Sequence, residues 1–363
     1  MMLNNRLKQA FLVLLRQGLW DRKEVETNLF PLNPDEWMQI YEMAVKQTVQ
    51  GIVYDGIKLL PKEQQPPRSL LIQWTVAIDQ LERMNRQQNA LLELLPRLFG
   101  QEPAIPYQVL KGQGIAAFYP NPLHRLCGDI DLYFGNEEQT EKANQRIESV
   151  GIPVERGRLG DSTYQLNGVI IEHHCRLVDL YHPNIRKEVK KWESYEFKKG
   201  KNTPSPMANH LLQTTHILKH LISKGIGLRQ FCDLAITLHQ QSTDINPQEL
   251  AKICHAWKIY RWHQLVYALL VKYIGMPKES LPFPTDINPE NLMEEVWESG
   301  NFGHGDERFG KRPEGKWKGK IHTLKIILNK FHLSLKYAPQ ETNHFLTDLI
   351  GLRIKELFTH ESN

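Results

Sequence analysis

The chain has 363 residues, which at roughly 150 residues per domain suggests two or three structural units. Hydrophobic residues make up 41% of it and no glycine or proline repeat occurs, so the composition excludes a disordered or fibrous protein. The formal net charge is only +4. It falls short of the strongly basic balance of nucleic-acid-binding proteins, and we expect no nucleic-acid partner.

The N-terminus does not look like an export signal. Its apolar stretch, residues 10–15, is short, ends at Arg16 and has no small-residue cleavage site. No run of about 20 apolar residues occurs, so we expect no transmembrane helix, no membrane partner and a cytoplasmic protein. The four cysteines are far apart and are expected to be buried free thiols.

Most of the chain is predicted to be helical. Residues 1–100 carry apolar side chains near helical spacing, and Pro66-Pro67 and Pro96 are expected to divide this region into several helices. Residues 201–363 are predicted to form a C-terminal helical domain. Its expected helices are 207–223, 228–241, 247–274, 319–336 and 341–358.

Residues 101–200 are predicted to form a small mixed core. Asn167-Gly168 indicates a hairpin, because both residues tolerate the positive φ of a tight turn. A charged stretch at 186–201 and a linker at 198–206 follow the core. The expected strands are 107–110, 130–134, 163–166 and 169–174, and the expected helices are 113–119 and 137–150. The fold class is therefore α+β, a small mixed sheet flanked by two helical regions.

Two acids in Gly128-Asp129-Ile130-Asp131-Leu132 are the strongest chemical feature. Residues i and i+2 of a strand point to the same face, about 7 Å apart at their Cα atoms. Asp129 and Asp131 would repel each other unless a cation lies between them, and Mg²⁺ prefers such oxygen ligands. The alternative is an exposed strand edge that carries two acids.

Two further features support a phosphate and metal site. The turn Lys111-Gly112-Gln113-Gly114 follows a predicted strand and precedes a short helix, where backbone N–H groups can hold a phosphate. Glu172 lies within an apolar strand, where an unpaired acid is costly to bury and a metal would give it a role.

This order of glycine turn, Asp-x-Asp and later acid resembles the DNA polymerase beta-like nucleotidyltransferases. The resemblance is closest to the uncharacterised bacterial nucleotidyltransferase family. It is carried by Leu110-Lys-Gly-Gln-Gly-Ile-Ala-Ala-Phe-Tyr-Pro120, Pro122, Arg125, Gly128-Asp-Ile-Asp-Leu132 and Ile171-Glu-His-His174, with weaker support from His216-x-x-x-His220, Leu228-Arg229-x-x-x-Asp233 and Gly300-Asn-Phe-Gly303.

The resemblance implies transfer of a nucleoside monophosphate from a nucleoside triphosphate to an acceptor hydroxyl, with Mg²⁺ or Mn²⁺. We expect ATP as the triphosphate, although no residue that reads the base can be identified. Asp129 and Asp131 match the metal-binding pair. Glu172 matches the third carboxylate, either as a metal ligand or as a base.

The resemblance also places a nucleotide-binding group. Gly112 matches the first glycine of the phosphate turn, and Gly128 precedes the acid pair. Gln113 stands where many relatives outside this branch carry Ser or Gly. Lys111 and Arg125 are candidate triphosphate contacts. A solvent-exposed lysine and a structural ion pair are their respective alternatives.

Four further residues are candidates for a supporting role around the site. His174 shares the strand face of Glu172 by alternation. His216 and His220 share a helix face, and no third ligand suggests that they bind zinc. Arg229 either contributes to the site or forms a helix ion pair with Asp233.

Other functions remain open from the sequence. The same fold could serve as a non-catalytic nucleotide-binding regulatory module, it could add nucleotides to RNA ends, or the acid pair could be incidental to a helical scaffold. A basic stretch around Trp317, within 311–320, is interpreted as a solvated loop. The acceptor, whether a small molecule, a sugar or a protein, and the oligomeric state are not predicted.

Overall fold

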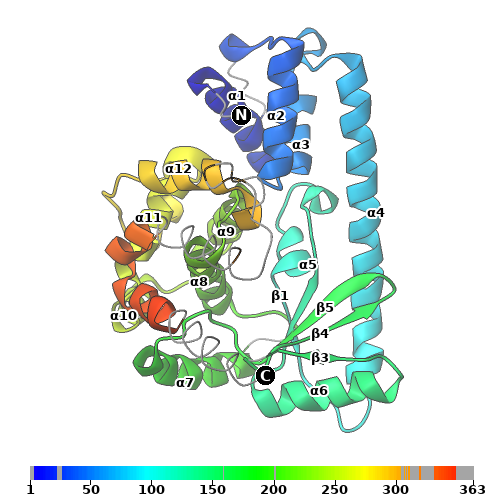
Figure 1. Ribbon diagram of the computed structural model, residues 1–363, viewed down its shortest axis with the longest axis vertical. Helices are drawn as coiled ribbons and strands as arrows, with labels where there is room; N and C mark the ends of the chain where they lie inside the picture. The colour runs from blue at the N-terminus through cyan, green and yellow to red at the C-terminus, as the bar shows by residue number, and fades with distance from the viewer. Residues whose placement is uncertain are drawn as a thin grey trace.

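The computed structural model describes residues 4–22, 27–157, 159–199, 202–303, 306, 308, 310, 319 and 331–348. Figure 1 shows a small sheet beside the long helix α4, with the N-terminal helices above it and the C-terminal helices on its other side. The helices are α1 (Asn5–Trp20), α2 (Pro34–Lys46), α3 (Gln50–Lys58), α4 (Arg68–Phe99), α5 (Lys111–Ala116), α6 (Glu137–Ser149), α7 (Pro183–Lys199), α8 (Pro206–Ser223), α9 (Leu228–Gln240), α10 (Pro247–Ala256), α11 (Tyr260–Leu269) and α12 (Glu290–Ser299).

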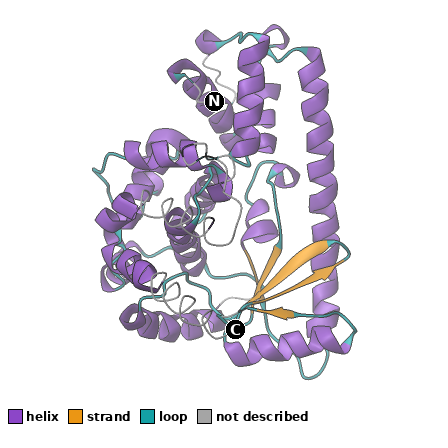
Figure 2. Cartoon of the chain, in the orientation of Figure 1, coloured by secondary structure: helices purple, strands orange, loops and turns teal. Residues whose placement is uncertain are grey.

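The sheet is mixed and has five strands in the order β1-β2-β5-β4-β3. The central pair, β2 and β5, is parallel, and the other three pairs are antiparallel. Figure 2 shows the strands as a fan between helices. The strands are β1 (Gln108–Leu110), β2 (Ile130–Tyr133), β3 (Glu155–Arg156), β4 (Ser162–Leu166) and β5 (Val169–His174).

The two faces of the sheet have different partners because side chains alternate along β2. Ile130 and Leu132 belong to an apolar cluster with the C-terminal half of α4 and with α6. Asp131 and Tyr133 lie on the opposite face, and Tyr133 belongs to the larger core that also includes the N-terminal and C-terminal helices. One acid of the predicted pair is therefore placed on the face that the C-terminal helices cover.

The predicted α+β class is confirmed: the chain is mostly helical with one small mixed sheet. The hairpin is present between β4 and β5, with φ of 50° at Asn167 and 81° at Gly168. The cysteines are all free and buried, as expected. None of the described helices is long and apolar enough to cross a bilayer. The division at residues 100 and 200 stays a prediction.

Several helix boundaries were predicted wrongly. Pro96 does not end α4, which continues to Phe99 because Leu95 and Phe99 pack against the sheet. The predicted helix 247–274 is interrupted at Trp257–Ile259, where Lys258 has a φ of 60°, and it ends in a π-helical turn. The predicted short helix begins at Lys111, two residues early.

The charged stretch after the core is also helical. Helix α7 covers Pro183–Lys199. The sequence did not predict this helix because, among its residues, only Ile185 and Val189 are both apolar and buried. Residues 198, 199 and 206 of the predicted linker are thus helical. Helical residues at 331–337 and 339–348 overlap the two predicted C-terminal helices, 319–336 and 341–358. The basic stretch around Trp317 lies outside the described residues.

Buried histidines should make the fold sensitive to acid, and His263 in α11 is the clearest case. Burial lowers its pKa to about 4, although the hydrogen bond from Nδ1 to the Ile259 carbonyl favours the charged form. Its Nε2 atom has no partner among the described residues. Between pH 6.5 and 4 the unfolded chain binds a proton that folded His263 rejects, so stability falls with falling pH. At pH 5 we expect this residue to cost roughly 2 kcal/mol relative to pH 7.

The change His263→Gln should therefore reduce the loss of stability between pH 7 and pH 5. Urea unfolding of wild type and variant at both pH values measures it. An equal loss of unfolding free energy in the two proteins would contradict this prediction.

Candidate active site

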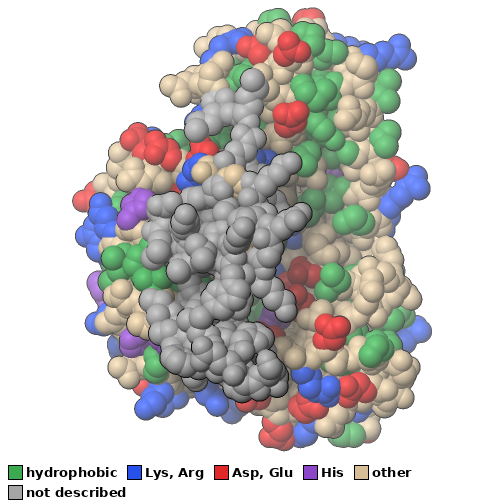
Figure 3. Space-filling model, viewed as in Figure 1, with side chains coloured by type: hydrophobic (Ala, Val, Ile, Leu, Met, Phe, Trp, Pro, Cys, Tyr) green, Lys and Arg blue, Asp and Glu red, His purple; other side chains and the backbone are tan. Residues whose placement is uncertain are grey.

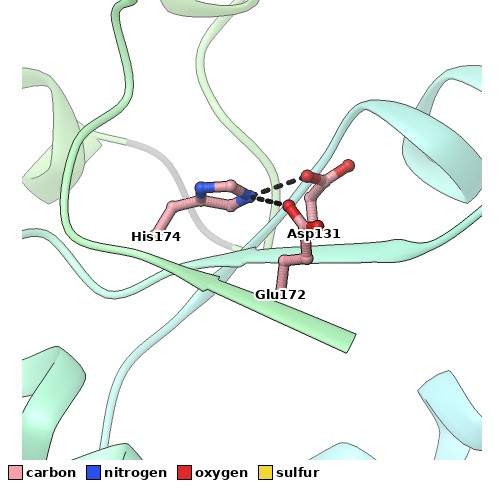
Figure 4. A group of neighbouring side chains, drawn as sticks. All are labelled: Asp131, Glu172 and His174. Carbon is pink, nitrogen blue, oxygen red and sulfur yellow. Dashed lines mark hydrogen bonds and ion pairs between the residues drawn. The ribbon is translucent and has the colours of Figure 1, made fainter. Parts of the chain in front are cut away.

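Strand register brings Asp131 and Glu172 together. Asp131 of β2 pairs with Glu172 of the parallel strand β5 and with Leu110 of the antiparallel strand β1. Paired residues of neighbouring strands point to the same face. Figure 4 shows Asp131, Glu172 and His174 projecting toward one another from these two strands. Sequence alternation had placed His174 on the Glu172 side, and the structure has it there.

Asp131 is a buried carboxylate held by two cationic groups. Its side chain is 3% exposed, Lys111 Nζ lies 2.9 Å from Oδ1, and His174 Nε2 donates to the same oxygen at 2.7 Å. Burial alone would raise the pKa of Asp131, but Lys111 and His174 outweigh it and hold that pKa far below its usual range. Burial and the charge of Lys111 lower the pKa of His174, but the carboxylates of Asp131 and Asp161 outweigh both and raise it to about 9.

The other two acids are not neutralised to the same degree. Burial and the negative charge of Asp131 raise the pKa values of both Glu172 and Asp129. Asp129 immediately precedes β2 and is half-buried. Among the described residues, the group that could hold a metal ion is Asp131, Glu172 and His174, whose ligand atoms lie within 4.8 Å of one another. Asp129 is not part of this group.

The predicted glycine turn lies beside these acids. Lys111 and Gly112 both have positive φ, 40° and 35°, where β1 passes into α5. A Cβ atom at Gly112 would lie 3.3 Å from the carbonyl oxygen of Asp129. A side chain at Gly112 would therefore be strained and crowd the acid pair, which explains why the turn needs glycine at this position.

The opposite wall is formed by α8. Asp179, which follows β5, accepts from His216 Nδ1 at 2.9 Å and lies 2.9 Å from Lys219 Nζ. His216 Nε2 is 3.0 Å from His220 Nε2. Because Asp179 can only accept from Nδ1, neutral His216 accepts at Nε2 and His220 donates. Burial lowers the pKa of His216 to about 4 and that of His220 to about 2, so both are neutral at pH 7.

The two predicted arginines have different partners. Arg125 is 5% exposed and forks onto Asp233, with Nε and Nη2 at 3.0 and 2.6 Å from the carboxylate oxygens. Arg229 donates to the Leu126 carbonyl, and its Nε atom is buried without a hydrogen-bond partner among the described residues. The ion pair considered for Arg229 with Asp233 is thus made by Arg125 instead.

Gln113 points away from the acids toward α4. Its amide donates to Asn85 at 3.1 Å and to Gln88 at 3.0 Å. Asn85 in turn donates to the carbonyls of Leu123 and Arg125. These amides tie the glycine turn and the segment before the acid pair to the same helix.

A pocket of about 260 Å³ lies among these groups and is lined by every predicted site residue except Gln113. In Figure 3, acidic side chains are visible in a recess beside the grey atoms. A larger cavity of about 620 Å³ lies near α11 and α12 and contains none of the predicted residues. The lining residues that the sequence analysis did not select are Ile115, Gln213, Lys219, Lys224, Gln230, Asp233 and Phe302.

One of these residues, Lys219, could have been predicted from its spacing in the sequence. Lys219 lies between His216 and His220, at a helical spacing of three from His216, so the predicted helix already placed it near that face. Asp179 had no comparable signal, because its position depends on the path of the chain after β5. That path is fixed by Glu193 of α7, which accepts from the backbone N–H groups of Leu177 and Val178.

The geometry agrees with a comparison with known families. A family model described as an uncharacterised nucleotidyltransferase matches residues 33–275, about two thirds of the chain. The chain belongs to this family. The match extends to α2–α4, which the sequence motifs had constrained only loosely, and it ends before the Gly300–Gly303 segment. No curated protein and no solved structure matches the chain significantly.

The Arg125–Asp233 ion pair should be important for the stability of this protein. Removal of one partner leaves a buried charge unpaired, and we expect Asp233→Leu to lower the free energy of unfolding by about 3–5 kcal/mol. Chemical denaturation of Asp233→Leu, Arg125→Met and the double variant measures this. The double variant should lose less than the sum of the single variants, and strict additivity would contradict a direct pair.

Proposed function

We propose that this nucleotidyltransferase moves a nucleoside monophosphate from a nucleoside triphosphate, with ATP as the expected donor, to an acceptor hydroxyl. The observation that carries the proposal is the convergence of Asp129, Asp131 and Glu172 with the Lys111–Gly112 turn on one pocket. Phosphoryl transfer requires mainly positioning and neutralisation of charge, and this pocket offers groups for both.

The carboxylates fit a divalent cation, with Mg²⁺ or Mn²⁺ as the expected ion. They supply the hard oxygen ligands that such ions prefer. Burial, and then the negative charge of Asp131, raises the pKa values of Glu172 and Asp129, and a bound cation would offset both effects. Asp131 and Glu172 would hold the ion, with Asp129 beside them. When bound, it would neutralise charge on the triphosphate and the attacking oxygen.

The remaining residues are assigned to the substrates. The Gly112 turn and Lys111 are assigned to the triphosphate, and Arg229 and Lys219 face it from the helical wall. In the reaction, the acceptor oxygen forms a bond to the α-phosphorus while the bond to pyrophosphate breaks. The acceptor hydroxyl gives up its proton to Glu172 where that residue acts as the base, and to solvent where Glu172 serves as a metal ligand. Gln213 and Gln230 offer hydrogen-bonding groups on the same wall for the acceptor or the nucleoside.

One observation favours a second function, a nucleotide-binding module without catalysis. Lys111 and His174 already neutralise Asp131 without a metal. Such a module would bind a nucleoside triphosphate and release no pyrophosphate with any acceptor.

Conversion of Asp131 or Asp129 to asparagine should abolish transfer while the fold is retained. Loss of a metal-binding carboxylate removes several kcal/mol of transition-state stabilisation, so we expect a decrease of about 1,000-fold or more. The measurement is release of pyrophosphate and incorporation of label from α-phosphate-labelled nucleoside triphosphates, with a panel of hydroxyl-bearing acceptors. Asp244→Asn changes an exposed acid that does not line the pocket, and it is the matched control.

Activity equal to wild type in both Asp131→Asn and Asp129→Asn would refute the proposed reaction. Binding of nucleotide by wild type without pyrophosphate release would favour the non-catalytic module.

A further inference from the structure

The ammonium group of Lys111 is paired with the carboxylate of Asp131, which a metal ion would need as a ligand. Its Nζ atom lies 2.9 Å from Oδ1 of Asp131, the most buried of the three acids, and the lysine side chain is itself only 18% exposed. The negative charges around Lys111 come from Asp131, Asp129 and Asp179. Lys111 is thus placed as an internal cation among the acids, not as a solvent-exposed residue.

The backbone adopts an unfavourable conformation to put Lys111 there. Leu110 pairs with Asp131 across β1 and β2 and shares its face, so regular alternation would turn the next residue to the opposite face. Instead, Lys111 takes a φ of 40°, an uncommon value for a residue with a side chain. Strain of this kind persists where surrounding contacts enforce it, and it clusters at functional sites.

The charge balance of the cluster changes when a metal ion binds. The three carboxylates carry three negative charges, and Lys111 with His174 supplies two positive charges. A divalent cation beside Asp131 and Glu172 would add two more, leaving Lys111 in contact with a carboxylate that a second cation shares. Like charges at this distance in a buried site repel strongly. Lys111 would then leave Asp131, and a phosphate bound at the adjacent Gly112 turn would offer it negative charge.

We propose that Lys111 is a built-in counter-cation that exchanges between Asp131 and the triphosphate. Without nucleotide it holds Asp131 and opposes metal binding. With nucleotide it pairs with phosphate oxygens, which frees Asp131 for the metal. Metal and nucleoside triphosphate therefore bind with positive coupling. This inference rests on the proposed function and adds that nucleotide binding favours metal binding at Asp131.

The coupling can be tested without an acceptor. Electron paramagnetic resonance of free Mn²⁺ gives the Mn²⁺ affinity of wild type and Lys111→Met, each with and without ATP and corrected for the Mn²⁺ that ATP binds in the absence of protein. Wild type should bind Mn²⁺ weakly alone and at least about tenfold more tightly with ATP. Lys111→Met should bind Mn²⁺ alone about tenfold more tightly than wild type does, and ATP should add little further affinity.

Three variants make the test specific. Lys142→Met removes a lysine of the same charge from an exposed pair with Glu138, and it should leave the Mn²⁺ affinity unchanged. Lys111→Arg should keep the coupling, because it keeps the charge. Lys111→Gly removes the ammonium group and the φ strain together, so it reports the same effect if Lys111→Met folds poorly.

Equal or weaker Mn²⁺ binding by both Lys111→Met and Lys111→Gly, with wild type still binding Mn²⁺ in the presence of ATP, would overturn the exchange and leave the proposed function standing. If neither wild type nor the Lys111 variants bind Mn²⁺ with or without ATP, the metal-dependent function itself fails.

Discussion

A buried carboxylate at the centre of the sheet organises this protein. Asp131 lies where β1, β2 and β5 meet, and it can be buried because Lys111 from one edge and His174 from the other neutralise it. An unpaired acid at this position would be expensive to bury. The same contacts bring the phosphate turn, the acid pair and Glu172 together, so the register of three strands determines the geometry of the site.

The surrounding helices hold the segments that carry these residues. Helix α4 packs its apolar side on the sheet, and its Asn85 and Gln88 side chains bind the backbone before the acid pair and the amide of Gln113. Helix α7 contributes Glu193, which fixes the segment that leads to Asp179. Buried polar contacts of this kind set the position of loops that have no regular structure of their own.

The sequence predicted those parts of the site that depend on local rules. Alternation placed His174 beside Glu172, and Asn167-Gly168 placed the hairpin. Contacts between segments that are distant in the chain could not be predicted from the sequence. Asp233 pairs with Arg125, 108 residues away, and not with Arg229 on its own helix. Helix α7 was missed because half of its buried residues are charged, with Glu193 and Glu196 taking the place of apolar residues.

The central claim is that the acids bind a nucleotide together with a metal. Calorimetric titration of the four nucleoside triphosphates, with and without Mg²⁺, into wild type, Asp131→Asn and Asp244→Asn tests it most directly. The account predicts Mg²⁺-dependent binding of at least one nucleotide by wild type and Asp244→Asn, and its loss in Asp131→Asn. Nucleotide binding that needs no metal and survives Asp131→Asn would contradict it.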